Sequence, residues 1–307
     1  MNFKPHNEPT EADHAAVATN HQFAALAMWS DPQKLAAEIV ALSHFSNLKK
    51  SPTYKFDEVK KWVVNGWNTE RILGLTAESL SDDALQCALQ WGFPQAYYSV
   101  YTLTLACFKT LGHTETSHTS VIRKFGSLAR DGKYPSSISF HATGHEPIEF
   151  IGVNHDSNFS ALAKPNNRHS AEKQIACFLS GTRKHDLKEK KKDFQLKTAT
   201  GKSKKNFTDA DWKKVSERLG HTSVVSLLYR KRIKSNYREI DTFLSSQIDG
   251  KNLFSSLRHI IQCLNLVHEA QIAKAIGKSD YDKLVSSVPA NDFHFVAARH
   301  GLIVPLL

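Results

Sequence analysis

The stretch from Pro94 to Gly112 constrains the fold most, because its sequence, PQAYYSVYTLTLACFKTLG, is apolar or aromatic on nearly every side. A helix without a polar face has to be surrounded by other elements. Pro94 suits the first position of a helix, and Gly112 suits the position just past its end. We therefore predict that this segment is the central helix of an antiparallel α-helical bundle.

Helical signals recur on both sides of this segment. Asp31 before Pro32 is typical of a helix start, and Ser81 followed by two aspartates indicates another. The N-terminal 30 residues predict a loose leader with a weakly helical centre, and the tail carries only scattered apolar residues. Further helices are expected over 58–67, 70–75, 118–125, 208–220, 224–246 and 253–276.

Residues 139–223 interrupt the helical pattern. Two short alternating runs, near 138–141 and 148–153, predict a small β-hairpin. The segment 183–205 then holds ten lysine and arginine residues against three acidic ones, a net charge of +7. We therefore expect four parts: an N-terminal helical extension (1–80), a bundle in two halves (81–138 and 224–277), a basic insertion between them (139–223) and a C-terminal tail (278–307).

The net charge of the chain, +10 from 40 basic and 30 acidic residues, favours a polyanionic partner, with nucleic acid ahead of a membrane surface. The alternative is an ordinary basic surface. The basic segment contains only Phe194 as an aromatic residue, so it is suited to phosphate contacts rather than base stacking, unless it is simply a solvated, mobile loop. The candidate nucleic-acid-binding residues are Arg183, Lys184, Lys190, Lys191, Lys192, Lys202, Lys204, Lys205 and Arg230.

Several classes of protein are not expected from this sequence. No run of about 18 apolar residues could cross a membrane, and no secretory signal is recognisable, so we expect a cytoplasmic chain with four reduced cysteines. The triplet Gly201–Ser203 lacks the upstream glycine of a phosphate-binding loop, because Leu196 stands there. His141, His145 and His155 lie close together in sequence but match no standard zinc pattern. Neither a metal nor a cofactor is expected.

Four segments together resemble the HEPN domain superfamily, most closely its small stand-alone bacterial and archaeal members. The first three are the Tyr-rich run from Ala96 to Tyr101, the following Gly112 and the helix start from Ser117 to Phe125. The fourth is Arg232-Ile-Lys-Ser-Asn236-Tyr237, which is similar to the family pattern R-x-x-A-D-Y. The resemblance covers roughly 81–138 and 224–277, about 110 residues.

The resemblance implies a helical bundle that is commonly dimeric. Many members are metal-independent endoribonucleases of toxin–antitoxin, CRISPR and anti-phage defence systems, so it also implies an RNA partner and raises the possibility of an acidic, antitoxin-like protein partner. Those enzymes use an Arg-x4-6-His pattern. A base removes the proton of the ribose 2′-OH, and a cation stabilises the charge that develops on the phosphate.

This sequence departs from that pattern, because no arginine is followed by a histidine at five to seven positions. The candidate catalytic residues are instead Arg232, Asn236, Tyr237 and His118. Arg232 and Tyr237 could form a remnant phosphate site; alternatively, Tyr237 caps the bundle and Arg232 pairs with an acid. His118 could hold its helix start or replace the missing base. Two functions follow: an RNA-directed effector with a degenerate ribonuclease motif, or a non-catalytic subunit that binds nucleic acid through the basic insertion and assembles through the bundle.

Overall fold

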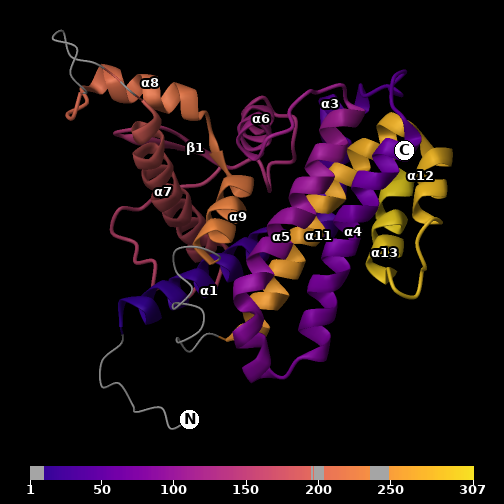
Figure 1. Cartoon of the computed structure of the whole chain (residues 1–307), viewed down its shortest axis with the longest axis horizontal. Coiled ribbons are helices and arrows are strands. Elements are labelled where there is room, and N and C mark those ends of the chain that lie inside the picture. The colour runs from indigo at the N-terminus through magenta and orange to yellow at the C-terminus, as the bar shows by residue number, and fades with distance from the viewer. Residues whose placement is uncertain (1–9, 195, 197–203, 236–248) are drawn as a thin grey trace.

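The computed structural model describes residues 10–194, 196, 204–235 and 249–307. Three long helices form its centre (Figure 1): α4 (Phe56–Ser79), α5 (Asp82–Thr110) and α11 (Gly250–Ile276). All three pack against one another, and α1 (Glu11–Trp29) lies against α11. The prediction of a mainly helical chain is confirmed. No helix among the described residues has the length and apolar character needed to cross a bilayer.

The Tyr-rich helix α5 lies at the core, as its sequence predicts. Most of its side chains from Ala96 to Phe108 are buried, and α11 covers them with residues that are buried along most of the helix from Leu253 to Ile276. Gly66 in α4 allows that helix to come close, because a Cβ atom there would lie 2.9 Å from the Leu103 side chain of α5. Burial of this shared surface from water is what stabilises the bundle.

The N-terminal boundary of α5 differs from the prediction. Pro94 does not begin the helix but lies inside it, and the helix starts at Ser81, whose side chain accepts a hydrogen bond from the Ala84 backbone N–H. Proline removes one hydrogen bond in a helix interior and crowds the preceding turn. Here that cost is outweighed because the surrounding residues Phe93, Ala96 and Tyr97 are buried.

Shorter helices surround this core. The predicted start at Asp31 is confirmed, since its side chain accepts a hydrogen bond from the Lys34 backbone at 2.7 Å. Within the predicted leader, residues 11–29 form the regular helix α1, and the C-terminal tail forms helices that the scattered apolar pattern did not predict. The bounds are α2 (Pro32–Ala41), α3 (Ser43–Ser46), α6 (His118–Arg130), α9 (Val224–Ile233), α12 (Lys278–Val285), α13 (His294–Ile303) and the 3-10 turn η2 (Val304–Leu306).

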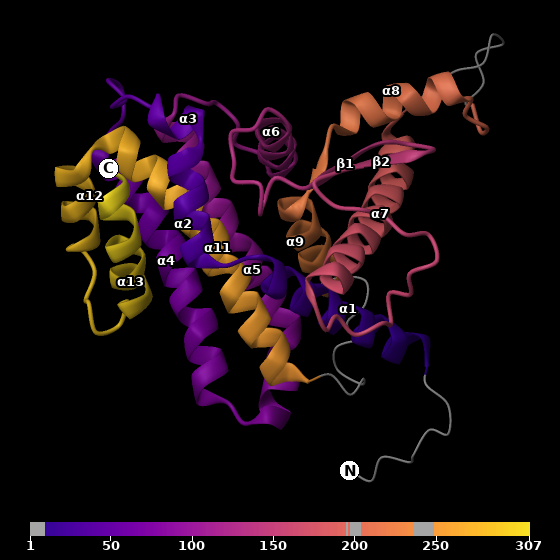
Figure 2. The ribbon, with the colours of Figure 1, turned by 180° about the vertical axis from the view of Figure 1, so that it is seen from behind.

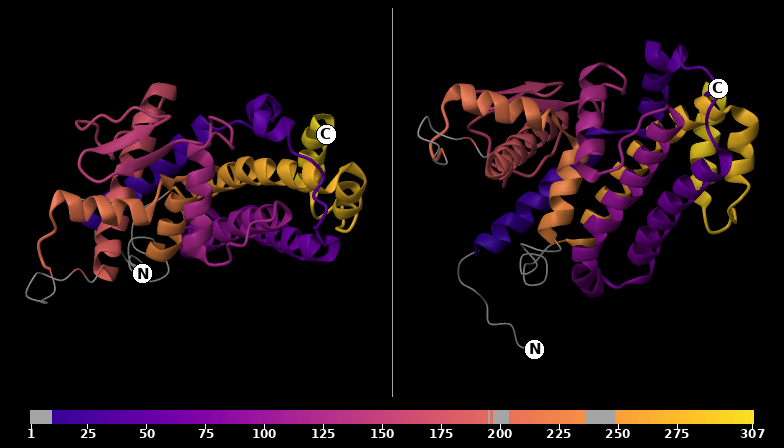
Figure 3. Two further views of the ribbon diagram at one scale, coloured as in Figure 1. Left: turned by 90° about the horizontal axis from the view of Figure 1, so that it is seen from above. Right: turned by 45° about the horizontal axis from the view of Figure 1, so that its top comes forward.

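A small sheet and two further helices lie on the opposite side of the bundle from α12 and α13 (Figures 1 and 2). A hairpin forms as predicted, but its first strand starts at His141 and includes residues expected to be the turn: β1 (His141–Gly144) pairs antiparallel with β2 (Ile148–Ile151). The short β3 (Thr222–Ser223) adds to the other edge of β1. Helices α7 (Arg168–Asp193) and α8 (Asp209–Leu219) form a projecting pair, which we call the arm (Figure 3). The alternative prediction of a solvated loop is therefore wrong for residues 183–193, because these residues continue α7.

A buried ionic cluster attaches α13 to the bundle. The guanidinium of Arg299 contacts Glu70 of α4 at 2.7 and 3.0 Å and Glu269 of α11 at 2.8 Å. The indole N–H of Trp67 and the hydroxyl of Tyr281 also donate to Glu269. Two carboxylates thus share one buried cation, and burial raises the pKa of Glu269 despite the opposing effect of Arg299.

This cluster predicts a pH dependence of stability. A raised pKa means that the folded chain binds a proton at Glu269 more tightly than the unfolded chain, so this group's contribution to stability grows as pH falls from neutrality toward its unfolded pKa, about 4.3. Urea unfolding of the wild type and Glu269→Gln, at about pH 7 and about pH 5, should show the wild type gaining stability relative to the variant at the lower pH. A constant difference between the two proteins would contradict the shift.

Candidate functional site: the Arg232–His118 cluster

Three helices bring polar and aromatic side chains together beside the core. Helix α5 contributes Tyr97, Tyr98 and Tyr101, α6 begins at His118, and α9 contributes Tyr229 and Arg232. We call these six residues the Arg232–His118 cluster. Tyr97 and Tyr101 are buried, whereas the other four members are only partly buried and reach solvent. The two predicted catalytic candidates that the structure describes therefore meet at one solvent-accessible place.

Aromatic rings surround the Arg232 guanidinium. Its Nη2 donates a hydrogen bond of 2.6 Å to the Tyr98 hydroxyl. Its central carbon lies 5.0 Å from the ring centroid of Tyr98 and 5.8 Å from those of Tyr97 and Tyr229. Such cation–π contacts hold a guanidinium in place while leaving its remaining N–H groups able to donate. A planar fork of this kind matches the oxygens of a phosphate or carboxylate.

His118 is held at the start of α6. The helix is capped by Ser117, whose hydroxyl accepts a hydrogen bond from the Ser120 backbone. The His118 ring lies 4.3 Å from that of Tyr101, whose hydroxyl donates to the Thr116 carbonyl at 2.8 Å. The structure thus places His118 at the first position of a helix that Ser117 caps, and near Arg232, whose charge acts on it.

The electrostatics of the cluster keep its histidine neutral. Burial lowers the pKa of His118, and the positive charge of Arg232 lowers it further. His118 Nδ1 lies 2.8 Å from the Tyr97 hydroxyl, and burial raises the pKa of that phenol, so Tyr97 stays protonated. Burial also raises the pKa of Tyr101, so at neutral pH the cluster combines the Arg232 cation, a neutral imidazole and the protonated phenols of Tyr97 and Tyr101.

The tyrosines are the part of the site that the sequence did not reveal. Their apolar surroundings indicated core residues, and Tyr97 is indeed fully buried. The available signal was the spacing of Tyr97, Tyr98 and Tyr101, which places hydroxyls on neighbouring parts of one helix turn. Asn236 and Tyr237, the other predicted catalytic residues, and Lys202 lie outside the described residues.

One predicted phosphate contact, Arg183, is not on the surface. Arg183 is fully buried between α7, the sheet and the end of α8. Its Nε donates to the Gly144 carbonyl at 3.0 Å, its Nη2 donates to the Ser216 hydroxyl at 2.7 Å, and its Nη1 donates to the Gly220 carbonyl. Because Arg183 lies in the basic segment of the sequence, it was predicted to be exposed like the neighbouring lysines. Its side chain instead points inward and joins the arm to the sheet.

The other described basic candidates lie mainly on the arm. Lys184, Lys192 and Lys205 are exposed, while Lys190 and Lys191 are partly buried. Several have internal partners: Lys190 pairs with Asp193, Lys192 with Glu189 and Lys204 with Asp211. Lys191 lies over the Phe207 ring at 4.6 Å, and Arg230 donates to the Thr182 hydroxyl at 3.0 Å. The arm thus remains a basic surface, although part of its charge is neutralised locally.

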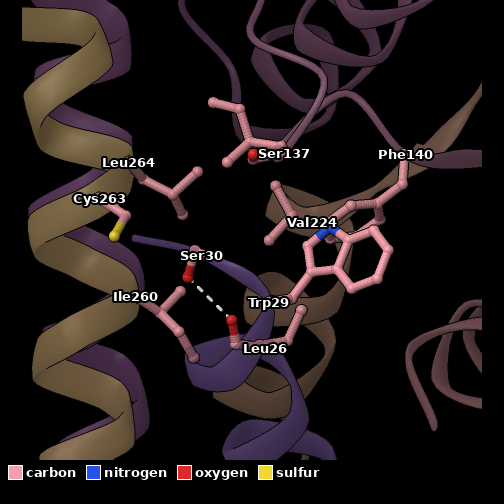
Figure 4. Close-up of a pocket in the computed structure, with 10 residues that line it drawn as sticks. Leu26, Trp29, Ser30, Ser137, Phe140, Val224, Ile260, Cys263 and Leu264 are labelled. Atoms are coloured by element: carbon pink, nitrogen blue, oxygen red, sulfur yellow. Dashed lines mark hydrogen bonds between the residues drawn. The ribbon is translucent and has the colours of Figure 1, made fainter. Parts of the chain in front are cut away.

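Two small pockets lie away from this cluster. Figure 4 shows the first, which lies where the end of α1 faces α11 and is lined mainly by apolar side chains, including Leu26, Trp29 and Leu264. The second lies between α4, α11 and α13 and includes Arg71, Glu78 and Arg258. Neither includes Arg232 or His118. Over the described ranges, no group of three potential metal-ligating side chains is gathered as a metal site would require.

Comparison with known proteins gives no match: no protein-family model, curated protein or solved structure is significantly similar to this chain.

Proposed function

We propose that this chain is a HEPN-like, RNA-directed protein of a defence or toxin–antitoxin type system, and that it binds an RNA phosphodiester at the Arg232–His118 cluster. The observation that carries the proposal is the meeting of Arg232 and His118, from segments 114 residues apart, at a surface reached by solvent. An arginine fork complements phosphate oxygens. The exposed lysines of the arm would contact other parts of the RNA backbone.

The test is the binding of a labelled oligoribonucleotide, measured by fluorescence anisotropy in EDTA. We expect Arg232→Gln to weaken binding by roughly 10- to 100-fold, because a hydrogen bond to a charged group contributes about 1.5–3 kcal/mol. The matched control is Arg258→Gln, which removes the same charge from a partly exposed arginine that pairs with Glu78. An equal effect of the two substitutions would reject the cluster as the binding site.

A metal-independent endoribonuclease is the second candidate, and the neutrality of His118 favours it. A neutral imidazole can accept the proton of a ribose 2′-OH as the 2′-oxygen attacks phosphorus and the 5′-oxygen leaves. Arg232 would stabilise the negative charge of that transition state. This role requires the His118 tautomer with a free lone pair on Nε2, in which Nδ1–H donates to the Tyr97 oxygen.

Cleavage separates the two candidates. The same RNA is incubated with protein in EDTA, and the products are analysed for a 2′,3′-cyclic phosphate end. An enzyme would cut this RNA, would spare a copy with a 2′-deoxyribose at the cut site, and would lose activity in both His118→Ala and Arg232→Gln. Intact RNA under all conditions, together with binding that depends on Arg232, would reject the enzyme and retain the binding protein.

A further inference from the structure

The neighbours of His118 determine which of its two imidazole nitrogens carries the hydrogen. Tyr97 is fully buried, and its hydroxyl hydrogen needs an acceptor, because an unpaired buried hydroxyl is costly. Within the described part of the chain, the hydrogen bond of that hydroxyl is made with His118 Nδ1, at 2.8 Å. A phenol that donates to Nδ1 leaves the imidazole hydrogen on Nε2.

The other groups around the imidazole are compatible with this arrangement. The Tyr101 hydroxyl donates to the Thr116 carbonyl, and Arg232, which can only donate, contacts the Tyr98 hydroxyl. Tyr229 faces the imidazole with its ring, at 6.0 Å between centroids. None of these groups faces the imidazole as a carboxylate that would draw a second proton onto it.

We infer that Tyr97 is a positioning residue that holds His118 with its hydrogen on Nε2, so that Nε2–H and the Arg232 guanidinium form a two-donor site for a phosphodiester anion. The inference rests on the proposed function for the identity of the anion. Its direct consequence is that His118 donates to the RNA rather than accepting a proton from it. In the wild-type protein the site is then built to hold a phosphodiester, not to cleave it.

The position of the proton can be measured without RNA. In protein labelled with ¹⁵N-histidine, long-range ¹H–¹⁵N spectra distinguish the two imidazole nitrogens, and the His118 signals are those that His118→Gln removes. We expect a protonated Nε2 in the wild type and a mixture of tautomers in Tyr97→Phe, which keeps the ring but lacks the hydroxyl. Tyr101→Phe, which removes a neighbouring hydroxyl, should keep the wild-type tautomer. A wild-type His118 protonated on Nδ1 would overturn the inference.

Two isosteres of His118 test the donor role. The glutamine side chain can place an N–H near the position of Nε2, whereas the shorter asparagine reaches only the position of Nδ1. With an octauridylate probe and anisotropy detection, we expect His118→Gln to bind within about threefold of the wild type and His118→Asn to bind about tenfold more weakly. Equal binding by both variants, or the reverse order, would overturn the two-donor site.

The two proposals fail in different ways. If the wild-type protein does not bind the octauridylate, the proposed function is rejected, while the spectra still decide whether Tyr97 sets the tautomer. If RNA binds and depends on Arg232 but Nδ1 carries the proton, the proposed function stands and the role of Tyr97 is rejected. The second result would also favour cleavage, because Nε2 would then be free to accept a proton.

Discussion

Replacing Arg299 with methionine should reduce the free energy of unfolding by about 3–5 kcal/mol, the usual result of removing one partner from a buried charge cluster. Arg299 is 4% exposed and lies between two buried carboxylates. Without it, Glu70 and Glu269 would repel each other in a site with little access to water. Urea unfolding at neutral pH measures the loss.

Two controls show whether the loss comes from uncompensated buried charge. Arg258→Met removes a more exposed arginine that pairs with Glu78, and a pair of this kind contributes at most about 1 kcal/mol. The triple variant Glu70→Gln, Glu269→Gln, Arg299→Met removes the unpaired charges and should recover most of the stability. If Arg299→Met and Arg258→Met have equal effects, the buried cluster does not attach α13 to the bundle as described.

The second large effect is expected at Arg183. Arg183→Met should destabilise the chain by roughly 2–4 kcal/mol, because it leaves the carbonyl groups of Gly144 and Gly220 without the donor that now satisfies them. Hydrogen exchange should rise first in α8, whose end loses its attachment to α7. Unfolding curves and exchange of the α8 amides provide the measurement.

The neighbouring lysine is the matched control. Lys184 is exposed, so Lys184→Gln should change stability by less than about 0.5 kcal/mol. It should instead reduce the salt dependence of RNA binding by about 0.7 in the slope of log K against log salt, if Lys184 contacts phosphate. An Arg183→Met variant with full stability would show that these internal hydrogen bonds do not hold the arm to the sheet.

The sequence predicted the parts of the fold that depend on local patterns. Helix starts at Asp31, Ser81, Ser117 and Thr208 follow from side chains that accept backbone hydrogen bonds, and the structure confirms all four. Alternation located the second strand of the hairpin, whereas the first strand lies mostly in the expected turn. At Pro94 the local pattern predicted a helix start, but tertiary burial keeps this proline inside a longer helix. In the tail the local pattern predicted no helix, and α13 is held instead by the distant partners of Arg299.

The candidate site was predictable only in part. Arg232 and His118 were identified from the resemblance, and the alternative in which an acid partners Arg232 has no support among the described residues, where its contacts are aromatic rings and the Tyr98 hydroxyl. The contact between Tyr97 and His118 depends on how α5 meets α6. Likewise, the direction of Arg183 depends on the packing of α7. Neither relation leaves a periodic signal in the sequence.

The position of Arg299 in the chain has a consequence for biosynthesis. Translation proceeds from the N-terminus, so Glu70 and Glu269 are both synthesised before the cation that they share. Until α13 follows, closing α4 and α11 around the two carboxylates is unfavourable, because buried carboxylates without a partner favour the open state. We therefore expect a released chain that is truncated before Arg299 to remain sensitive to protease at α4 and α11.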